Sequence, residues 1–136
     1  MIESTTLVRV RYGETDQMGY VYYGNYAQFF EIGRVELFRK LDVSYKSLED
    51  SGIMMPVIKL NSNYHHPAYY DDELRIVTSI PEIPDGVRIY FEYKIFNQNN
   101  LLLHTGSTEL VFINMKKNKP SRIPNVLREK LIELSK

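Results

Sequence analysis

The chain has 136 residues, and its 17 Lys and Arg balance 17 Asp and Glu, so that the formal net charge is zero. A neutral chain gives no reason to expect nucleic acid or an anionic membrane as a partner. The absence of cysteine excludes disulfides, thiolate metal ligands and cysteine nucleophiles, and no apolar run is long enough to span a bilayer.

The first predicted elements are a strand, a glycine-rich loop and a helix. Alternation over residues 5–12 places Val8, Val10 and Tyr12 on one face and predicts a half-buried strand. Three glycines within residues 13–24 exclude a helix interior there. From residue 25 the period changes, because apolar positions recur four, three, four and four residues apart. These positions form one helical stripe: Tyr26, Phe30, Gly33, Leu37 and Leu41.

This predicted helix, over residues 25–41, has two further properties. More apolar side chains lie beside the stripe, so we expect protein to surround most of the helix. Asn25 followed by Gln28 predicts a variant of the capping box at its start.

The rest of the chain predicts a short helix over residues 44–51, a series of strands and a terminal helix over residues 126–134. An extended segment covers residues 53–64, and alternating strands follow over 74–80, 87–96 and 101–115. Gly106, inside the last strand, predicts a bulge or bend. Short turns join the last three strands, which predicts an antiparallel meander.

The order of these elements predicts an α+β fold. One strand, one buried helix and four further strands favour a curved antiparallel sheet of about five strands wrapped around one long central helix. A length of 136 residues suits one domain, which we expect to cover residues 1–136. The order of the strands within the sheet does not follow from the pattern.

The loop over residues 11–19 joins the first strand to the start of the buried helix. A helix start presents unpaired backbone N–H groups with partial positive charge, which bind an anion or a developing oxyanion. Asp16, just before it, is a candidate to attack a carbonyl carbon or to activate a water. The structural alternative is that Asp16 is a helix cap or a turn residue.

A longer pattern surrounds Asp16. The chain has Arg11-Tyr12-x-Glu14-Thr15-Asp16-x-x-Gly19-x-Val21-Tyr22-x-x-x-Tyr26, followed by Glu31-x-x-Arg34. This resembles the signature of the 4-hydroxybenzoyl-CoA thioesterase-like hotdog-fold family, closest to the bacterial Tol-Pal-associated acyl-CoA thioesterases. Two later segments support the likeness, which runs in order from about residue 5 to about residue 130. They are Pro67-Ala68 with Asp71-Asp72-Glu73-Leu74, and Lys117-x-Lys119-Pro120 with Ile123-Pro124.

The resemblance implies a hotdog-fold acyl-CoA thioesterase without metal or cofactor. It implies a homodimer or homotetramer with its sites at subunit interfaces. It also implies that Asp16 is the nucleophile or general base, and that the backbone N–H of Tyr23 polarises the thioester carbonyl as the oxyanion hole. Close relatives often carry His where Tyr23 stands, and a main-chain role at this position does not depend on that side chain.

The same resemblance implies a set of residues around the substrate. The positions near the acyl group are Tyr22, Gly24, Asn25 and Tyr26, and Gly24 suits a close approach of substrate to the backbone. An acidic residue at the position of Glu31 lies near the site in some relatives, so Glu31 is a further candidate. Glu31 is also spaced to pair with Arg34 along the helix.

Basic and histidine side chains elsewhere have simpler interpretations. Arg88, Lys117 and Lys119 are candidates for contacts with CoA phosphates, although a solvated surface is the usual place for such lysines. His65 and His66 precede Pro67 and lack a third ligand at helical spacing, so we expect a structural role at a strand end rather than a metal site. We expect His104, inside a strand, to be hydrogen-bonded or solvated.

Two other functions stay open. A hotdog protein that acts on acyl-carrier-protein thioesters needs a basic docking surface, which the neutral charge disfavours. An inactive acyl-CoA-binding protein is disfavoured by the intact Asp16. A dehydratase is weaker still, because those hotdog enzymes use a helix His, and no His occurs before residue 65. The first residues lack the basic and apolar regions of a signal peptide, so we expect a cytoplasmic protein.

Overall fold

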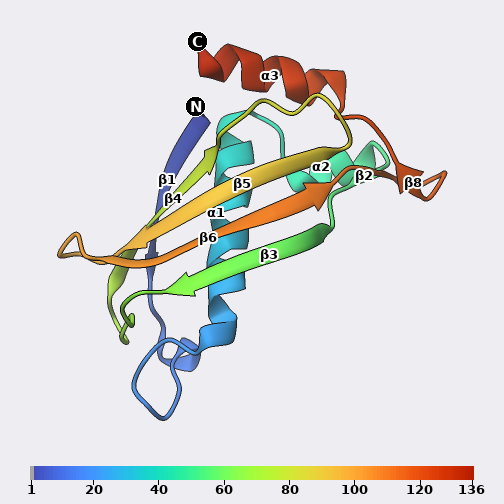
Figure 1. The fold of residues 1–136 in the computed structure, drawn as a ribbon. Coiled ribbons are helices and arrows are strands. Elements are labelled where there is room, and N and C mark those ends of the chain that lie inside the picture. The colour runs from blue at the N-terminus through green and yellow to red at the C-terminus, as the bar shows by residue number, and fades with distance from the viewer. Residues whose placement is uncertain (1) are drawn as a thin grey trace.

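A curved antiparallel sheet of five strands wraps one long helix in the computed structural model, which describes residues 2–136 (Figure 1). The helix, α1 (Tyr26–Lys40), packs against the sheet on its concave side. The predicted α+β architecture is therefore confirmed. The strands in spatial order are β1 (Ile2–Arg9), β4 (Glu73–Ile80), β5 (Arg88–Phe96), β6 (Leu102–Val111) and β3 (Val57–Tyr64).

The meander prediction is confirmed, because β4, β5 and β6 are consecutive antiparallel neighbours. The strand order that the sequence left open puts β1 at one edge, beside β4, and β3 at the other edge, beside β6. Strand β3 therefore precedes β4 in sequence but pairs with β6, the last strand of the meander.

The predicted apolar stripe of α1 faces the sheet, and all of its members are buried. Gly33 lies where helix and sheet come closest, since a Cβ there would be 2.1 Å from Oγ1 of Thr78. The expectation that protein surrounds most of the helix is wrong for the single chain. Gln28 and Glu31 are exposed because the sheet covers only one side of the helix.

The helix entrance differs from the predicted capping box. A short 3-10 turn, η2 (Tyr23–Asn25), precedes α1. Asn25 accepts no helix N–H through its side chain and instead donates from Nδ2 to the carbonyl of Glu14, at 2.8 Å. The hydrogen bond therefore fastens the start of the helix to the loop before it.

Strand β1 begins and ends earlier than the alternation predicts. The chain leaves the strand after Arg9 and enters a 3-10 turn, η1 (Tyr12–Glu14). Val10 is buried as expected, but Tyr12 is 78% exposed because this turn carries its ring away from the sheet.

The bulge predicted at Gly106 in the last strand is found at a different residue. Gly106 pairs in regular register with Tyr93 of β5, and the bulge of β6 lies near Leu103. The glycine is needed for another reason, because a Cβ at this position would lie 2.4 Å from Cζ of Phe30. The absence of a side chain at Gly106 therefore leaves room for the Phe30 ring of α1 against the sheet.

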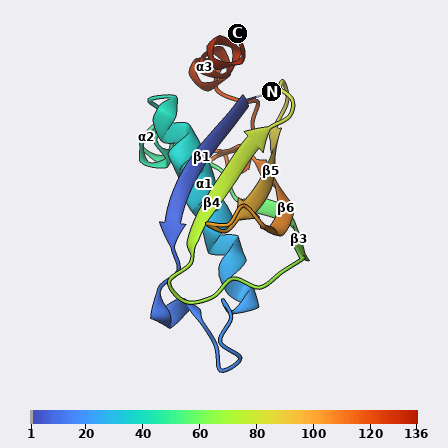
Figure 2. The ribbon, with the colours of Figure 1, turned by 90° about the vertical axis from the view of Figure 1, so that its left-hand side faces the viewer.

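The remaining elements lie around the ends of the sheet. The predicted short helix is α2 (Tyr45–Asp50), and the predicted terminal helix is α3 (Asn125–Ser135), which lies across the end of the sheet where β1 begins (Figure 2). A small second sheet, which the sequence did not predict, contains β2 (Ile53–Met54), β7 (Ile113–Asn114) and β8 (Lys119–Pro120). Among the described residues, no helix is long and apolar enough to cross a membrane.

Arg34 is buried between α1, α2 and the sheet and does not pair with Glu31 as the spacing suggested. Its guanidinium donates to two phenol oxygens, Nε to Tyr45 and Nη1 to Tyr93, each at 3.0 Å. Burial raises the pKa of Tyr93 to about 12, so that its hydroxyl keeps its proton. The contacts give Arg34 a role in joining the helices to the sheet.

Candidate active site

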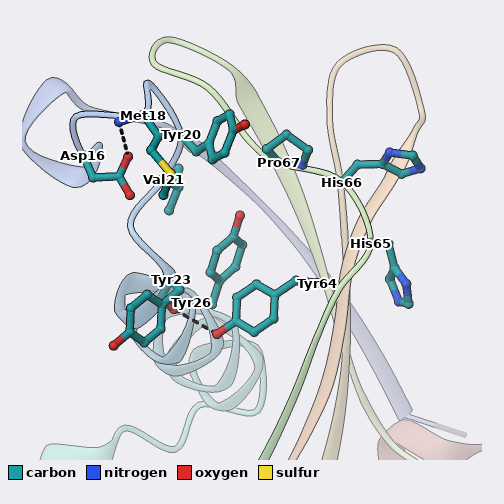
Figure 3. Close-up of a pocket in the computed structure, with 10 residues that line it drawn as sticks. All are labelled: Asp16, Met18, Tyr20, Val21, Tyr23, Tyr26, Tyr64, His65, His66 and Pro67. Carbon is teal, nitrogen blue, oxygen red and sulfur yellow. Dashed lines mark hydrogen bonds between the residues drawn. The ribbon is translucent and has the colours of Figure 1, made fainter.

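A cavity of about 280 Å³ lies at the entrance of α1, next to the free end of β3 (Figure 3). Its walls come from the loop before the helix, from the first turn of the helix, and from the segment that follows β3. The lining residues are Asp16, Met18, Tyr20, Val21, Tyr23, Tyr26, Tyr64, His65, His66 and Pro67.

The loop that carries Asp16 is fastened through Glu14. The Glu14 carboxylate accepts the backbone N–H of Arg11 at 2.7 Å, and its carbonyl accepts the N–H of Tyr22 at 2.8 Å as well as the Asn25 side chain. A further backbone bond, from Val21 to the carbonyl of Ala68 at 2.8 Å, joins the loop to the segment before β4. Glu14 is therefore a structural carboxylate, largely buried and already engaged.

Asp16 combines a turn role with a place in the cavity wall. Its Oδ1 accepts the backbone N–H of Met18 at 2.9 Å, and its own N–H donates to the carbonyl of Tyr20 at 2.9 Å. Gly19 completes the turn with a φ of +85°, a conformation that suits glycine. The other carboxylate oxygen of Asp16 has no hydrogen-bond partner within residues 2–136. Asp16 is half-buried, and one of its carboxylate oxygens is thus left without a hydrogen bond from the described residues.

The helix entrance brings Tyr23 to the same cavity. Tyr23 is the first residue of the 3-10 turn, a position whose backbone N–H points out of the turn without a carbonyl partner. No acceptor for this N–H occurs in the part of the chain that the structure describes. The hydroxyl of Tyr64 donates to the Tyr23 carbonyl at 3.1 Å, which anchors the turn to β3. Tyr23, with its unpaired N–H, and Asp16, with its carboxylate, therefore line one cavity, and these two groups are of the kind that stabilise an oxyanion beside an attacking group.

The structure separates the other predicted acyl-group residues into two sets. Tyr26 lines the cavity, whereas Tyr22, Gly24 and Asn25 do not. The Tyr22 ring packs beside the Tyr23 ring, with 4.6 Å between centroids, and lies over Gly24, where a Cβ would be 2.8 Å from its Cε2. The pKa of Tyr22 is raised, first by its contact with the Tyr23 hydroxyl and in smaller part by the Asp16 carboxylate.

Asn25 and Glu31 lie away from the cavity. Asn25 faces a second, open hollow of about 390 Å³, which it shares with Arg11, Gly13, Glu14 and Gln28. Glu31 is exposed on the face of α1 that the sheet leaves uncovered.

His65 and His66 line the cavity, which the sequence did not predict. Both backbone N–H groups donate to the carbonyl of Leu103, at 2.9 and 3.0 Å, and Nε2 of His65 lies 2.9 Å from Oγ1 of Thr105. Figure 3 shows both imidazole rings turned away from Asp16. The expected strand-end contacts are present, and the segment also forms a cavity wall. Its run of aromatic and histidine side chains before Pro67 was the only sequence signal for this.

His104 is fully buried and stacks on the Tyr26 ring, which lines the cavity. It is hydrogen-bonded as expected, since Nε2 lies 2.5 Å from Oγ of Ser62. Its Nδ1 atom is buried without a partner among residues 2–136. Burial, with a smaller contribution from His65, lowers the pKa of His104 from 6.5 to about 4. The imidazole is therefore neutral at physiological pH.

The candidate CoA-phosphate residues lie at the other end of the sheet. Arg88 is the first residue of β5 and forms an ion pair with Glu109 at 3.0 Å, while Lys117 and Lys119 belong to the turn and strand of β7–β8 (Figure 1). The cavity lies beyond the opposite end of β3, and an eight-residue strand spans about 23 Å. One protomer therefore does not bring these side chains to the cavity.

Comparison with known proteins shows the family. Residues 10–131 match the model of a family described as the thioesterase-like superfamily. The chain belongs to this thioesterase-like superfamily. One curated relative is the acyl-CoA thioester hydrolase YbgC of Escherichia coli, which is 34% identical over 86% of this chain and 87% of the relative. Another is the putative acyl-CoA thioesterase YneP of Bacillus subtilis, which is 32% identical over 83% of this chain and 81% of the relative.

A solved thioesterase has nearly the same fold over the whole chain. The DHNA-CoA thioesterase of Staphylococcus aureus has a TM-score of 0.92 and 37% identity, and the match covers 99% of this chain and 92% of that one. The family and the hotdog fold predicted from the sequence are thereby confirmed. Thioesterases hydrolyse thioesters, so the prediction that the chain is an enzyme of this class is confirmed as well. Within residues 2–136, no three metal-ligating side chains come together.

Proposed function

We propose that this chain is an acyl-CoA thioesterase in which Asp16 delivers the nucleophile and the helix entrance at Tyr23 binds the oxyanion. The observation that carries the proposal is that the Asp16 carboxylate and the Tyr23 turn line the same cavity. One oxygen of Asp16 is held by the N–H of Met18, while the other is unengaged. The turn thus fixes the carboxylate without neutralising it.

The proposed reaction converts an acyl-CoA and water into a carboxylic acid and CoA. The acyl carbonyl sits with its oxygen at the unpaired N–H of Tyr23, which stabilises the negative charge of the tetrahedral intermediate. Asp16 either takes a proton from the attacking water or attacks the carbonyl carbon itself. In the second route an acyl-aspartyl anhydride forms as CoA thiolate leaves, and water then hydrolyses the anhydride. Both routes need an ionised Asp16.

The cavity favours an aromatic acyl group. Tyr20, Tyr23, Tyr26 and Tyr64 supply four rings to its wall, and such rings bind planar apolar groups through offset or edge-to-face contacts while their hydroxyls recognise polar substituents. The 37% identity to the S. aureus DHNA-CoA thioesterase supports the same class. Tyr22, Gly24, Asn25 and Glu31 stay proposed substrate contacts, although none of them lines the cavity of the single chain.

We also propose that the protein is a homodimer, or a tetramer built from such dimers, with β3 at the interface. Strand β3 is a sheet edge, which favours pairing with another strand. It is also unusually apolar for an exposed element, because Ile58, Leu60 and Tyr64 are each about half exposed. A second copy that pairs its own β3 here removes both the free edge and the exposed apolar side chains from water.

The dimer gives the basic residues a place beside the cavity. If two copies of β3 pair antiparallel, the Val57 end of one strand lies next to the Tyr64 end of the other. The β7–β8 turn of a neighbouring copy then approaches the cavity, so that Arg88, Lys117 and Lys119 become candidates for the CoA phosphates. The site in this arrangement belongs to both subunits.

The alternatives make different demands on the surface. An acyl-carrier-protein thioesterase needs a broad basic docking face, whereas the basic residues near the proposed site form one short cluster. An inactive acyl-CoA-binding protein does not need an unengaged carboxylate in the cavity. We propose that residues 1–136 act as one thioesterase domain in the cytoplasm, a reducing compartment compatible with a chain that lacks cysteine.

The test is a hydrolysis screen in which released CoA thiol is measured. The substrates are acetyl-, short-chain, long-chain, hydroxybenzoyl- and hydroxynaphthoyl-CoA, with matched acyl-carrier-protein thioesters. We expect the highest kcat/KM with an aromatic acyl-CoA. Faster hydrolysis of the carrier-protein thioesters would contradict the choice of CoA, and tight binding without turnover on every substrate would contradict the enzyme.

A further inference from the structure

His104 does not line the cavity but packs against Tyr26 and Tyr64, two residues that do. It occupies β6 opposite Tyr64 of β3, on the face of the sheet that carries α1, and its side chain is fully buried. The imidazole stacks on the Tyr26 ring at 4.0 Å and 10°, and it meets the Tyr64 ring edge-on at 4.6 Å and 80°. These three residues, Tyr26, Tyr64 and His104, form a ring cluster in which Tyr26 and Tyr64 also touch each other edge-on.

The ring cluster connects His104 to the helix entrance. Tyr64 uses its hydroxyl to bind the carbonyl of Tyr23 at 3.1 Å. That carbonyl belongs to the turn whose first N–H is the proposed oxyanion donor. The orientation of His104 is itself fixed, because Nε2 and Oγ of Ser62 lie 2.5 Å apart. A continuous series of contacts therefore runs from Ser62 through His104 and Tyr64 to the Tyr23 turn.

The unpartnered Nδ1 of His104 indicates which form of the ring is present. A buried N–H without an acceptor costs more than a buried lone pair, so the favoured tautomer carries its proton on Nε2, which donates to Ser62. The ring then presents a neutral flat face to Tyr26. A buried histidine that touches no solvent and bears no charge is not placed to transfer protons to substrate.

We propose that His104 is a positioning residue for thioester hydrolysis, which acts through Tyr64 to hold the Tyr23 turn against the cavity. The inference rests on the proposed function for its catalytic consequence, while its structural part concerns the Tyr23 turn alone. A residue that only fills space would affect stability; a positioning residue also changes kcat, and it does so through the same contact as Tyr64.

The kinetic test is a double-mutant cycle with His104→Leu and Tyr64→Phe. Each single variant is expected to lower kcat by about fivefold, the effect of one hydrogen bond of ordinary strength, with a smaller change in KM. The double variant should be no slower than the slower single variant, because both changes release the same turn. His104→Phe, which keeps a flat ring, should recover most of the kcat. Effects that multiply in the double variant, or a His104→Leu enzyme within twofold of wild type, would overturn the inference.

A matched control lies on the same strand. Thr108 is buried on the same face of β6 and bonds a buried tyrosine, Tyr93, at 2.6 Å, but at a distance from the cavity. Thr108→Val should lower Tm and leave kcat unchanged. An equal loss of kcat in Thr108→Val would assign the His104 effect to general destabilisation of β6.

A second measurement separates the inference from the proposed function. The backbone amide signals of Tyr23 and Gly24 in a ¹⁵N-labelled protein report the turn without any substrate. Ser62→Ala, which removes the partner that orients His104, should shift these signals in the same direction as Tyr64→Phe. Unchanged signals in Ser62→Ala, together with shifted ones in Tyr64→Phe, would refute the inference even if wild type hydrolyses no thioester. Wild type that is inactive on every thioester contradicts only the proposed function.

Discussion

The buried neutral His104 makes the stability of the protein depend on pH. Its pKa is about 4 in the folded protein, against an ordinary value of 6.5, because burial disfavours the charged ring and His65 adds to the effect. The rings that face it, Tyr26 from α1 and Tyr64 from β3, bring no carboxylate to the imidazole. Between these two pKa values the unfolded chain binds the proton and the folded protein does not. The part of the folding stability that depends on neutral His104 is therefore fully present above pH 6.5 and is lost as the pH falls toward 4.

The size of this effect follows from the two pKa values. Between pH 7 and pH 5 the free energy of unfolding should fall by about 2 kcal/mol on account of His104 alone. Urea unfolding at fixed protein concentration measures it, with His104→Phe as the comparison, because other titrating groups contribute equally to both proteins. The variant should lose about 2 kcal/mol less than wild type over this interval. Parallel pH dependences in the two proteins would refute the reasoning, since the histidine would then titrate alike in both states.

Two further predictions concern assembly and CoA binding. Leu60→Lys places a charge on the exposed apolar face of β3 and should convert the proposed dimer to a single chain of 16.0 kDa with lower kcat/KM. Light scattering that shows a dimer in this variant would contradict an interface at β3. Replacing Lys117 and Lys119 together by Ala should raise KM several-fold for acyl-CoA with little change in kcat, since phosphate contacts are equal in ground and transition states. The effect should vanish with pantetheine thioesters, and equal losses on both substrates would place the lysines elsewhere.

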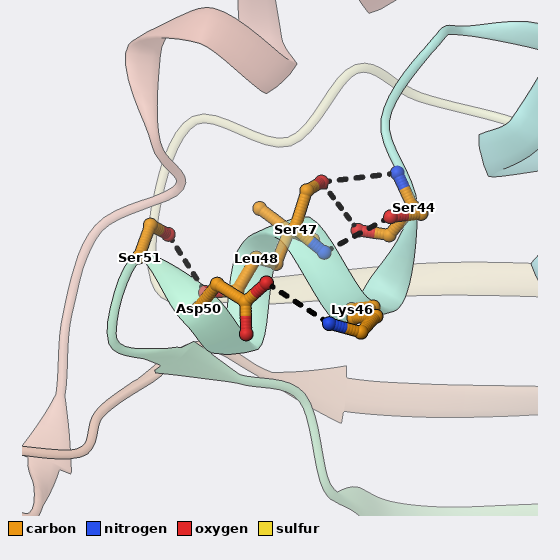
Figure 4. A network of polar contacts seen from close by, with 6 residues as sticks. All are labelled: Ser44, Lys46, Ser47, Leu48, Asp50 and Ser51. Carbon is orange, nitrogen blue, oxygen red and sulfur yellow. Dashed lines mark hydrogen bonds and ion pairs between the residues drawn. The ribbon is translucent and has the colours of Figure 1, made fainter.

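Local sequence patterns predicted the elements of the fold well where the physical cause was also local. Helix α2 is one example: Ser44 and Ser47 form a reciprocal capping box, and the Ser51 hydroxyl donates to the Leu48 carbonyl (Figure 4). Lys46 and Asp50 add an ion pair one turn apart on the surface. Contacts within four residues determine both ends of this helix, so composition and spacing were sufficient.

Prediction failed where a distant contact replaced the local one. Asn25 had the spacing of a cap, but Glu14, eleven residues earlier, accepts its hydrogen bond. Gly106 suggested a bulge, yet its missing side chain accommodates Phe30 from the helix. Strand order has the same origin, since the β3–β6 pairs join residues as far apart in the chain as Val57 and Leu110. No periodicity within a segment carries such information.

The candidate site was predicted in part for the same reason. Asp16, Tyr23 and Tyr26 belong to the loop and helix start that carry the family pattern, and the structure brings all three to one cavity. The wall formed by Tyr64, His65 and neighbouring residues comes from a segment that is distant in sequence. The basic candidates Lys117 and Lys119 lie far from the cavity within the single chain, and their place beside it depends on the proposed dimer.

The most direct test of the central claim is the hydrolysis rate of Asp16→Asn on the best acyl-CoA. Asparagine keeps the oxygen that accepts the Met18 N–H, so the turn and the fold should persist, and only the ionised oxygen is lost. Asp42→Asn is the matched control, because it removes an exposed carboxylate just after the far end of α1, where a φ of 56° suits asparagine. Glu14→Gln controls for the loop and should cost much less than Asp16→Asn. We expect Asp16→Asn to lower kcat by at least about 10²-fold with unchanged Tm, and Asp42→Asn to keep full activity. An Asp16→Asn enzyme, checked for deamidation, that stays within a few-fold of wild type would contradict the account.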